Sequence, residues 1–187
     1  MLRNSTLTDG ELIKAYQAGD ENAFRTLVKR YESRVAATVI GMLGKCPEAE
    51  DVGQETFIRF HDSINKFRGE STVGTYITRI AINLSLNELK RRKRRRFLFP
   101  DETRDGDLGH VIEDSSDRID QKTIVRQAIQ KLPPDFRSVI VLRLIDGYST
   151  NETAEILKLP VGTVLSRLSR AQKKLKKILA PYAGELT

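Results

Sequence analysis

Tryptophan is absent from this chain of 187 residues, and cysteine occurs only once. The single Cys46 cannot form an internal disulfide, and with two well-separated histidines, His61 and His110, it makes no metal cluster. No apolar run reaches the roughly 18 residues of a transmembrane helix, and the first residues lack the apolar core of a signal peptide. No activated nucleophile or phosphate-binding loop can be recognised. These absences predict a soluble, cytoplasmic protein with no metal, no cofactor and no catalysis of its own.

The composition and the distribution of charge indicate two modules. Hydrophobic residues make up 39% of the chain and charged residues 30%, which suits small helical units better than one large core. The formal net charge of +7 points to a polyanionic partner, a property shared with many other basic proteins. Residues 97–120 are acidic and lack a helical period, whereas both flanking segments are basic. We expect a flexible linker over 97–120 between modules 8–96 and 121–180, the alternative being an ordered acidic loop packed on one module.

Helical spacing of apolar residues predicts an all-α fold. In the first module, capping residues, glycines and a proline delimit four helices: from Thr8 to Gly19, from Asp20 to between Gly41 and Gly44, from Pro47 to Ile64, and from Ser71 or Thr72 to Arg96. The fourth helix carries an apolar face on one side and an amide and cationic ladder on another, formed by Arg79, Asn83, Asn87, Lys90 or Arg91, and Arg94. It ends in seven consecutive basic residues. Taken alone, it could be an ordinary solvated amphipathic helix with a basic tail.

The second module ends in a pattern typical of DNA-binding proteins. Two helices are predicted before Pro133 and over 135–145, and a capping box at 149–152 then starts a short helix over 150–157. A turn at 158–160 leads to a long helix that reaches about Leu179 and carries cationic side chains opposite its apolar face. A short helix, a three-residue turn and a longer basic helix indicate a helix-turn-helix, the alternative being an ordinary helical hairpin.

Four segments resemble one family in its own order: EAEDVGQETFIRF, FRGESTVGTYITRIAINLSLNELKRRKRR, LPPDFRSVIVLRLIDGYSTNETAEIL and LPVGTVLSRLSRAQKKL. They span most of the chain, and their combination is highly specific. The chain resembles bacterial RNA polymerase sigma factors of the sigma-70 family, in particular the short extracytoplasmic-function (ECF) group with only regions 2 and 4. The resemblance implies two small helical domains, a region 2 bundle and a region 4 helix-turn-helix, joined by the acidic linker.

The resemblance also implies the sites. The residues that match the segment docking on the clamp helices of the polymerase β′ subunit are Asp51, Gln54, Glu55 and Phe57. Those that match the capture of −10 DNA are Phe67, Arg68, Ser71, Tyr76, Arg79, Asn83, Lys90 and Arg91, with the loop 67–72 receiving a flipped base. Those assigned to the −35 element are Leu165, Ser166, Arg167, Arg170 and Lys173. Two positions depart from the family pattern, because Tyr76 replaces a usual tryptophan and Leu165 replaces a common cationic residue.

The function implied is that of a sigma factor. It binds core RNA polymerase, recognises a −35 duplex and stabilises melted −10 DNA, and the family also implies an anti-sigma partner. The alternative is a helix-turn-helix regulator that acts on duplex DNA without polymerase, in which the first module senses a signal. A basic helical RNA-binding protein is a remote third option, since no RNA-binding module can be recognised. Leu165 could also simply join Val164 and Leu168 in the core.

Overall fold

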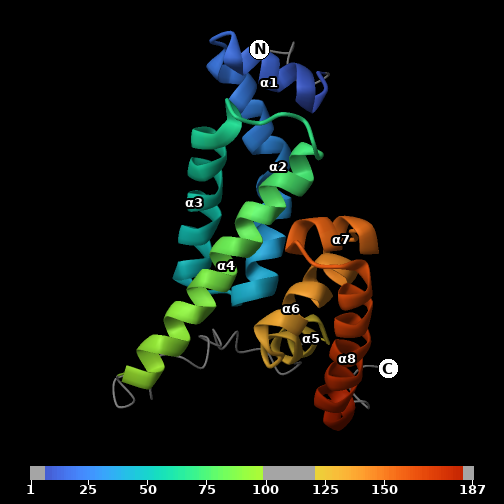
Figure 1. Ribbon diagram of the computed structural model, residues 1–187. Coiled ribbons are helices and arrows are strands. Elements are labelled where there is room, and N and C mark those ends of the chain that lie inside the picture. The colour runs from blue at the N-terminus through green and yellow to red at the C-terminus, as the bar shows by residue number, and fades with distance from the viewer. Residues whose placement is uncertain (1–6, 99–120, 183–187) are drawn as a thin grey trace.

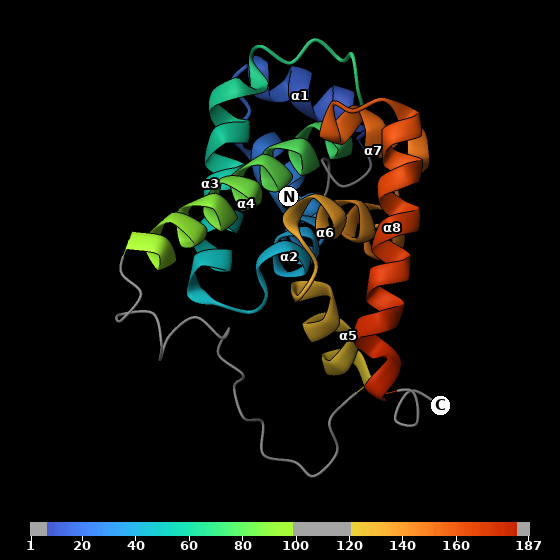
Figure 2. The same cartoon turned by 60° about the horizontal axis from the view of Figure 1, so that its bottom comes forward.

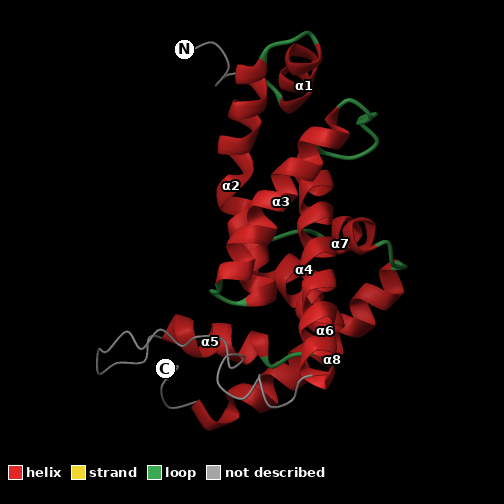
Figure 3. Cartoon of the chain, turned by 90° about the vertical axis from the view of Figure 1, so that its left-hand side faces the viewer, coloured by secondary structure: helices red, strands yellow, loops and turns green. Residues whose placement is uncertain are grey.

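The computed structural model describes residues 7–98 and 121–182. Within these ranges all regular structure is helical, which confirms the all-α prediction (Figures 1 and 3). The first half contains α1 (Asp9–Gln17), α2 (Glu21–Leu43), α3 (Pro47–Ile64) and α4 (Val73–Leu98). The second contains α5 (Gln121–Gln130), α6 (Pro134–Ile140), a π-helical turn (Val141–Ile145), α7 (Thr150–Leu157), α8 (Val161–Leu179) and a 3₁₀ turn (Ala180–Tyr182). No helix in these two ranges is long and apolar enough to cross a membrane.

Local signals set the helix ends. Thr8 and Ser149 both form the predicted capping boxes, in which the hydroxyl accepts from a backbone N–H three residues later and the Glu there accepts in return. Of the two candidate caps for α4, Thr72 is the one used, since its Oγ1 accepts from the Thr75 N–H at 3.1 Å. The first two residues of the predicted linker, Phe97 and Leu98, still belong to α4; the rest of the predicted linker lies outside the described residues.

The expectation of one regular helix over 135–145 is wrong in its second half. The α-helix stops at Ile140, and the chain continues as a π-helical turn in which the Asp146 N–H donates to the Val141 carbonyl, five residues back, at 2.9 Å. Gly147, with φ of 76°, then reverses the chain. Because the wider turn accommodates an extra residue, it turns Asp146 and Tyr148 toward the first half of the molecule.

The two halves pack against each other. α5, α6 and α7 lie along α2 and α4, as two views of the molecule show (Figures 1 and 2). One buried apolar cluster runs through both halves and includes Val39, Met42, Ile77, Val141 and Ile156. The closest approach is at Gly41 in α2, where an added Cβ would lie 3.0 Å from Val141 Cγ2. The sequence did not predict this arrangement, because only the small size of one glycine permits it.

Polar bonds cross the same contact. The Thr78 and Tyr148 hydroxyls are 2.7 Å apart in a buried hydrogen bond, and Thr38 Oγ1 donates to Asp146 Oδ2 at 2.8 Å. The Gln130 amide donates to the Gly41 carbonyl at 2.7 Å. Burial raises the pKa of Asp146 to about 6, although the Thr38 hydrogen bond and the nearby Arg34 charge act in the opposite direction. The fold therefore keeps the Asp146 carboxyl buried, although burial disfavours its charged form.

Asp146 is expected to make the protein less stable as pH rises from about 4 to 7. A carboxyl whose pKa is raised on folding binds its proton more tightly in the folded state, so the free energy of unfolding falls as pH rises through that interval, by on the order of 1–3 kcal/mol. An Asp146→Asn variant keeps an acceptor for Thr38 and should remove this dependence, so that it is more stable than the parent at pH 7 and about equal at pH 4.

Urea unfolding at several pH values measures the effect. Asp62→Asn is the matched control, because the Asp62 side chain is 71% exposed. Parallel pH profiles for the parent and Asp146→Asn would contradict the assignment.

Candidate nucleic-acid interface

The polar ladder of α4 faces outward along most of the helix. Asn83, Asn87, Lys90 and Arg94 are all exposed, and the C-terminal end of α4 projects away from the other helices (Figures 1 and 2). The helix buries the opposite residues against α2 and α3, so its orientation is fixed by the core. The amide and basic groups that the sequence assigned to DNA are thus accessible to a polyanion.

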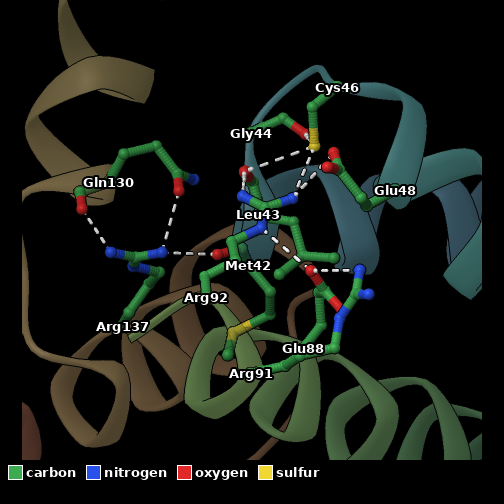
Figure 4. Close-up of polar contacts among 10 residues, drawn as sticks. All are labelled: Met42, Leu43, Gly44, Cys46, Glu48, Glu88, Arg91, Arg92, Gln130 and Arg137. Atoms are coloured by element: carbon green, nitrogen blue, oxygen red, sulfur yellow. Dashed lines mark hydrogen bonds and ion pairs between the residues drawn. The ribbon is translucent and has the colours of Figure 1, made fainter. Parts of the chain in front are cut away.

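The basic residues at the C-terminal end of α4 do not all face solvent. Arg92 turns back into the protein, where it donates to Glu88 Oε1 at 3.1 Å, Glu48 Oε2 at 3.2 Å and Cys46 Sγ at 3.0 Å (Figure 4). Glu88 is buried and also accepts from Arg91 Nε at 2.7 Å, although the Arg91 side chain stays 65% exposed. Arg92 therefore ties α4 to the connection between α2 and α3, and the exposed positive charge at this end of α4 comes from its neighbours.

A pocket of about 520 Å³ forms where the loop after α3 meets the start of α4. Five of the eight predicted −10 residues line it together with three others, the full set being Lys66, Phe67, Arg68, Glu70, Ser71, Tyr76, Arg79 and Glu155. The predicted Asn83, Lys90 and Arg91 lie farther along α4 and are not part of its lining. The Tyr76 ring meets the Phe67 ring edge-on at 5.2 Å between centroids and lies 6.2 Å from the Phe60 ring. Aromatic packing thus holds Tyr76 at the pocket, where a ring face can stack on an unpaired base.

Arg79 is held by the second half of the molecule. Its Nη2 donates to Glu155 Oε1 at 3.0 Å and to the Glu155 carbonyl at 3.1 Å. The side chain is only 22% exposed, so the guanidinium is already paired in the position where the sequence predicted a phosphate contact. Glu155 comes from α7, the first helix of the helix-turn-helix.

The predicted polymerase-binding residues all lie on α3, but they differ in how far they are exposed to solvent. Asp51 and Gln54 are exposed, and Glu55 accepts from Arg59 Nε at 2.7 Å on the same outer face. Phe57 packs against the core and is only partly exposed. The outer face therefore presents acidic and amide groups, the chemistry expected to meet a cationic surface.

The helix-turn-helix has the predicted geometry. Lys158 takes the left-handed conformation, with φ of 52°, and ends α7 before the turn into α8. Ser166, Arg170 and Lys173 are exposed on α8, whereas Arg167 forms an ion pair with Asp135 at 3.2 Å. Leu165 is 52% exposed while Val164 is fully buried, so the alternative that Leu165 joins the core is wrong.

Sequence reasoning missed the residues that join the halves, namely Arg137, Asp146, Tyr148 and Glu155. Arg137 left a signal that could have been noticed, because it is a charged residue separated only by Ser138 from the apolar run VIVL. The sequence around the other three gave no such signal, since each forms its hydrogen bond with a residue at least 70 positions away.

Comparisons with known proteins agree with this geometry. The family model for Sigma-70 region 2 matches residues 27–95, and that for Sigma-70, region 4 matches residues 122–175. The chain is 35% identical to the RNA polymerase sigma-H factor of Pseudomonas aeruginosa, over 95% of this chain and 96% of that protein. It is also 35% identical to the ECF RNA polymerase sigma factor SigW of Bacillus subtilis, over 89% and 94%.

Two solved structures share the fold. The sigma factor RpoE, in complex with the anti-sigma factor NepR from Bartonella quintana, aligns with a TM-score of 0.68 at 24% identity, over 84% of this chain and 96% of that chain. CnrH, in complex with the cytosolic domain of CnrY, aligns with a TM-score of 0.69 at 24% identity, over 92% and 97%. With both regions present in order and 35% identity over nearly the whole length, the chain belongs to the ECF group of the sigma-70 family of RNA polymerase sigma factors.

Proposed function

We propose that this sigma factor directs core RNA polymerase to promoters through three surfaces. Asp51, Gln54 and Glu55 on α3 dock on the β′ clamp helices, with Phe57 behind them. The exposed face of α8 reads the −35 duplex, and the pocket beside α4 receives an unstacked −10 base. The observation that carries the proposal is the pocket itself, which joins aromatic rings to Arg68 and Arg79 at the loop assigned to −10 DNA.

The mechanism follows from differential binding. Residues 8–96 and 121–180 act as two DNA-binding units, and residues 97–120 tether them so that one contact raises the effective concentration of the other. Phosphate contacts from Lys90 and Arg91 position the DNA, while Phe67, Ser71, Tyr76 and Asn83 favour the melted −10 strand over the duplex.

The proposal assigns no catalytic step to this chain, because polymerase carries the chemistry. It places the protein in the cytoplasm with polymerase, and it includes an anti-sigma partner by analogy with the complexes named for its structural relatives.

Run-off transcription tests the proposal. Core polymerase with this chain should give discrete transcripts from a genomic promoter pool, and core polymerase alone should give none. Under the proposal the free chain retards duplex promoter DNA only weakly. Tight retardation of duplex DNA without polymerase, together with no transcripts, would instead identify a conventional helix-turn-helix regulator.

Leu165 is expected to shape the −35 preference. It is exposed near the N-terminal end of α8, the part of a recognition helix that reaches base edges. A leucine cannot donate a hydrogen bond but can pack on a thymine methyl, so the preferred site should contain a T, or its complement A, where cationic relatives favour G. A Leu165→Arg change should shift the preference by roughly 1–3 kcal/mol if a bidentate contact to guanine forms.

Selection of −35 sequences from a random library by both holoenzymes measures the shift. Exposed Val161→Arg, at the first position of α8, serves as a control for added charge on the same helix. Identical selected sites for the parent and Leu165→Arg would remove Leu165 from the base-reading residues.

A further inference from the structure

The turn of the helix-turn-helix holds a lysine in a backbone conformation that lysine disfavours. Lys158, directly after α7, has φ of 52° and ψ of 49°. Its N–H donates to the Glu155 carbonyl at 3.3 Å, and the Leu159 N–H donates to the Ala154 carbonyl at 3.0 Å, so this left-handed residue closes α7. At the four other positions with positive φ in residues 7–98 and 121–182, the chain has glycine. Glycine adopts this conformation without steric cost because it lacks a Cβ, so a lysine here needs another reason.

The Lys158 side chain makes no polar contact with the rest of the described protein. It is exposed, and within the described residues its ammonium group has no hydrogen-bond or ion-pair partner. The nearest acidic residue along the chain, Glu155, is bound to Arg79 instead. An ion pair within the protein therefore does not explain the lysine, and its charge is free to meet an anion outside the protein.

Lys158 also supplies the unpaired positive charge nearest to the start of α8. Residues 150–169 contain two cationic residues, Lys158 and Arg167. Arg167 is bound to Asp135, with Nη2 and Oδ2 3.2 Å apart, and its side chain is only 27% exposed. The first half of α8 thus exposes Leu165 but no free positive charge of its own, although a helix that enters DNA needs phosphate contacts to fix its position.

The place of Lys158 in the chain suits a phosphate at the edge of the major groove. Only Leu159 and Pro160 separate it from Val161, the first residue of α8. The groove is about 12 Å wide and an α-helix with its side chains is about 10–12 Å across, so a helix in the groove has a row of phosphates close on each side. A residue just before such a helix lies near the level of these phosphates, and the flexible four-carbon side chain of lysine can extend its charge to one of them.

We propose that Lys158 binds a DNA phosphate beside the −35 element and so fixes the position at which α8 enters the major groove. Leu165 then selects bases, while Lys158 adds affinity that does not depend on sequence. The proposal rests on the proposed reading of −35 DNA by α8. It accounts for a lysine at a left-handed position, since the gain in DNA binding offsets a cost in the stability of the turn.

Removing the charge should affect the fold and DNA binding in opposite directions. Lys158→Gly relieves the backbone conformation, so this variant should unfold at the same temperature as the parent or up to about 4 °C higher. Lys158→Asn removes the same charge with a residue that also tolerates positive φ, and Lys158→Arg retains the charge. Lys14→Ala, at an exposed lysine on α1, is the control for the loss of one positive charge elsewhere.

Holoenzymes assembled from core polymerase and each full-length chain provide the binding test. The probe is a labelled duplex that carries the −35 sequence selected by the parent and ends before the −10 element, so that strand melting does not contribute. At about 0.1 M salt, Lys158→Gly and Lys158→Asn should bind about three- to tenfold more weakly than the parent, and Lys158→Arg and Lys14→Ala within about twofold of it. For the two neutral variants, the slope of log affinity against log salt concentration should fall in magnitude by about 0.9, the value for one phosphate contact.

Neutralising single phosphates identifies the contact. In a series of duplexes, one phosphate at a time beside the −35 element is replaced by an uncharged methylphosphonate. One position should weaken binding by the parent but leave binding by Lys158→Gly unchanged. An equal loss of affinity by Lys158→Gly on every duplex in the series would show a structural effect of the turn and refute the proposal, as would binding equal to that of the parent. If Lys158→Gly is less stable than the parent, Lys158→Asn decides by the same two criteria.

Run-off transcription separates this proposal from the proposed function. If the parent gives discrete transcripts but the neutral variants show no loss at a particular phosphate, Lys158 is not a DNA contact and the function stands. If the parent neither gives transcripts nor binds the −35 duplex, the proposed function fails and the assignment of Lys158 fails with it.

Discussion

Replacing Arg137 by methionine is expected to lower the free energy of unfolding by about 2–4 kcal/mol. Arg137 is 7% exposed, and its guanidinium lies where α2 and α5 both end (Figure 4). Nη1 donates to the Met42 carbonyl at 2.6 Å and to Gln130 Oε1 at 2.9 Å, while Nη2 donates to the Leu132 carbonyl at 3.0 Å and also to the Gln130 carbonyl. One side chain thus satisfies carbonyls at two helix ends.

Two effects of the substitution oppose each other. Burial lowers the pKa of Arg137 to about 10, with a smaller contribution from the Arg92 charge, so the buried cation carries a desolvation cost that methionine would remove. Methionine would also leave three carbonyls without a donor, at a cost of about 1–3 kcal/mol each where they are buried. The carbonyls lie at the negative ends of helix dipoles, which favours a cation there. We expect the loss of these bonds to exceed the gain.

Urea unfolding at pH 7 measures the change, with Arg126→Met at an exposed site on α5 as the control. Arg137→Lys should fall between the parent and Arg137→Met, because an ammonium cannot reach both helix ends at once. A fully stable Arg137→Met variant would show that the buried charge contributes nothing net to the fold.

Reversing two charges on α3 is expected to abolish association with core polymerase. Asp51→Lys combined with Glu55→Lys turns an acidic face into a basic one, and we expect affinity to fall at least about 100-fold, since a desolvated charge pair in an interface is worth 2–5 kcal/mol or more. The fold should survive, because Asp51 is exposed and the Glu55 side chain is 42% exposed. Losing the Glu55–Arg59 pair costs only about 0.3–0.5 kcal/mol.

Co-purification with core polymerase measures the binding, and thermal unfolding by circular dichroism checks the fold. Reversal of two exposed acidic residues on α2, Glu21→Lys with Glu32→Lys, makes the same charge change on a different helix. If the α3 variant still co-purifies as the parent does, these two residues are not part of the polymerase surface.

The sequence by itself determined most of the helices and their ends, the π-helical turn after Ile140 being the main exception. Thr8, Ser149 and Pro47 act on backbone groups within one turn of their own position, so their effect can be read from a few adjacent residues. The same holds for the turn at Lys158 and the basic outer face of α8. Leu165 was left open because the spacing places it beside Val164 on the helix, and only the packing of α8 decided that it faces outward.

The tertiary structure alone decided how the two halves meet and what this does to the site. Arg79 and Glu155 are 76 positions apart, and Thr38 and Asp146 are 108 apart. Such pairs depend on the shape of two surfaces rather than on periodicity, and the small volume of Gly41 opposite Val141 leaves no pattern along the chain. Arg92 and Arg94 look alike in a run of basic residues, yet one is bound to Glu88 and Glu48 and the other is exposed. Local spacing reveals which face of a helix is polar, but the neighbouring helices decide which of those polar groups remain accessible to DNA.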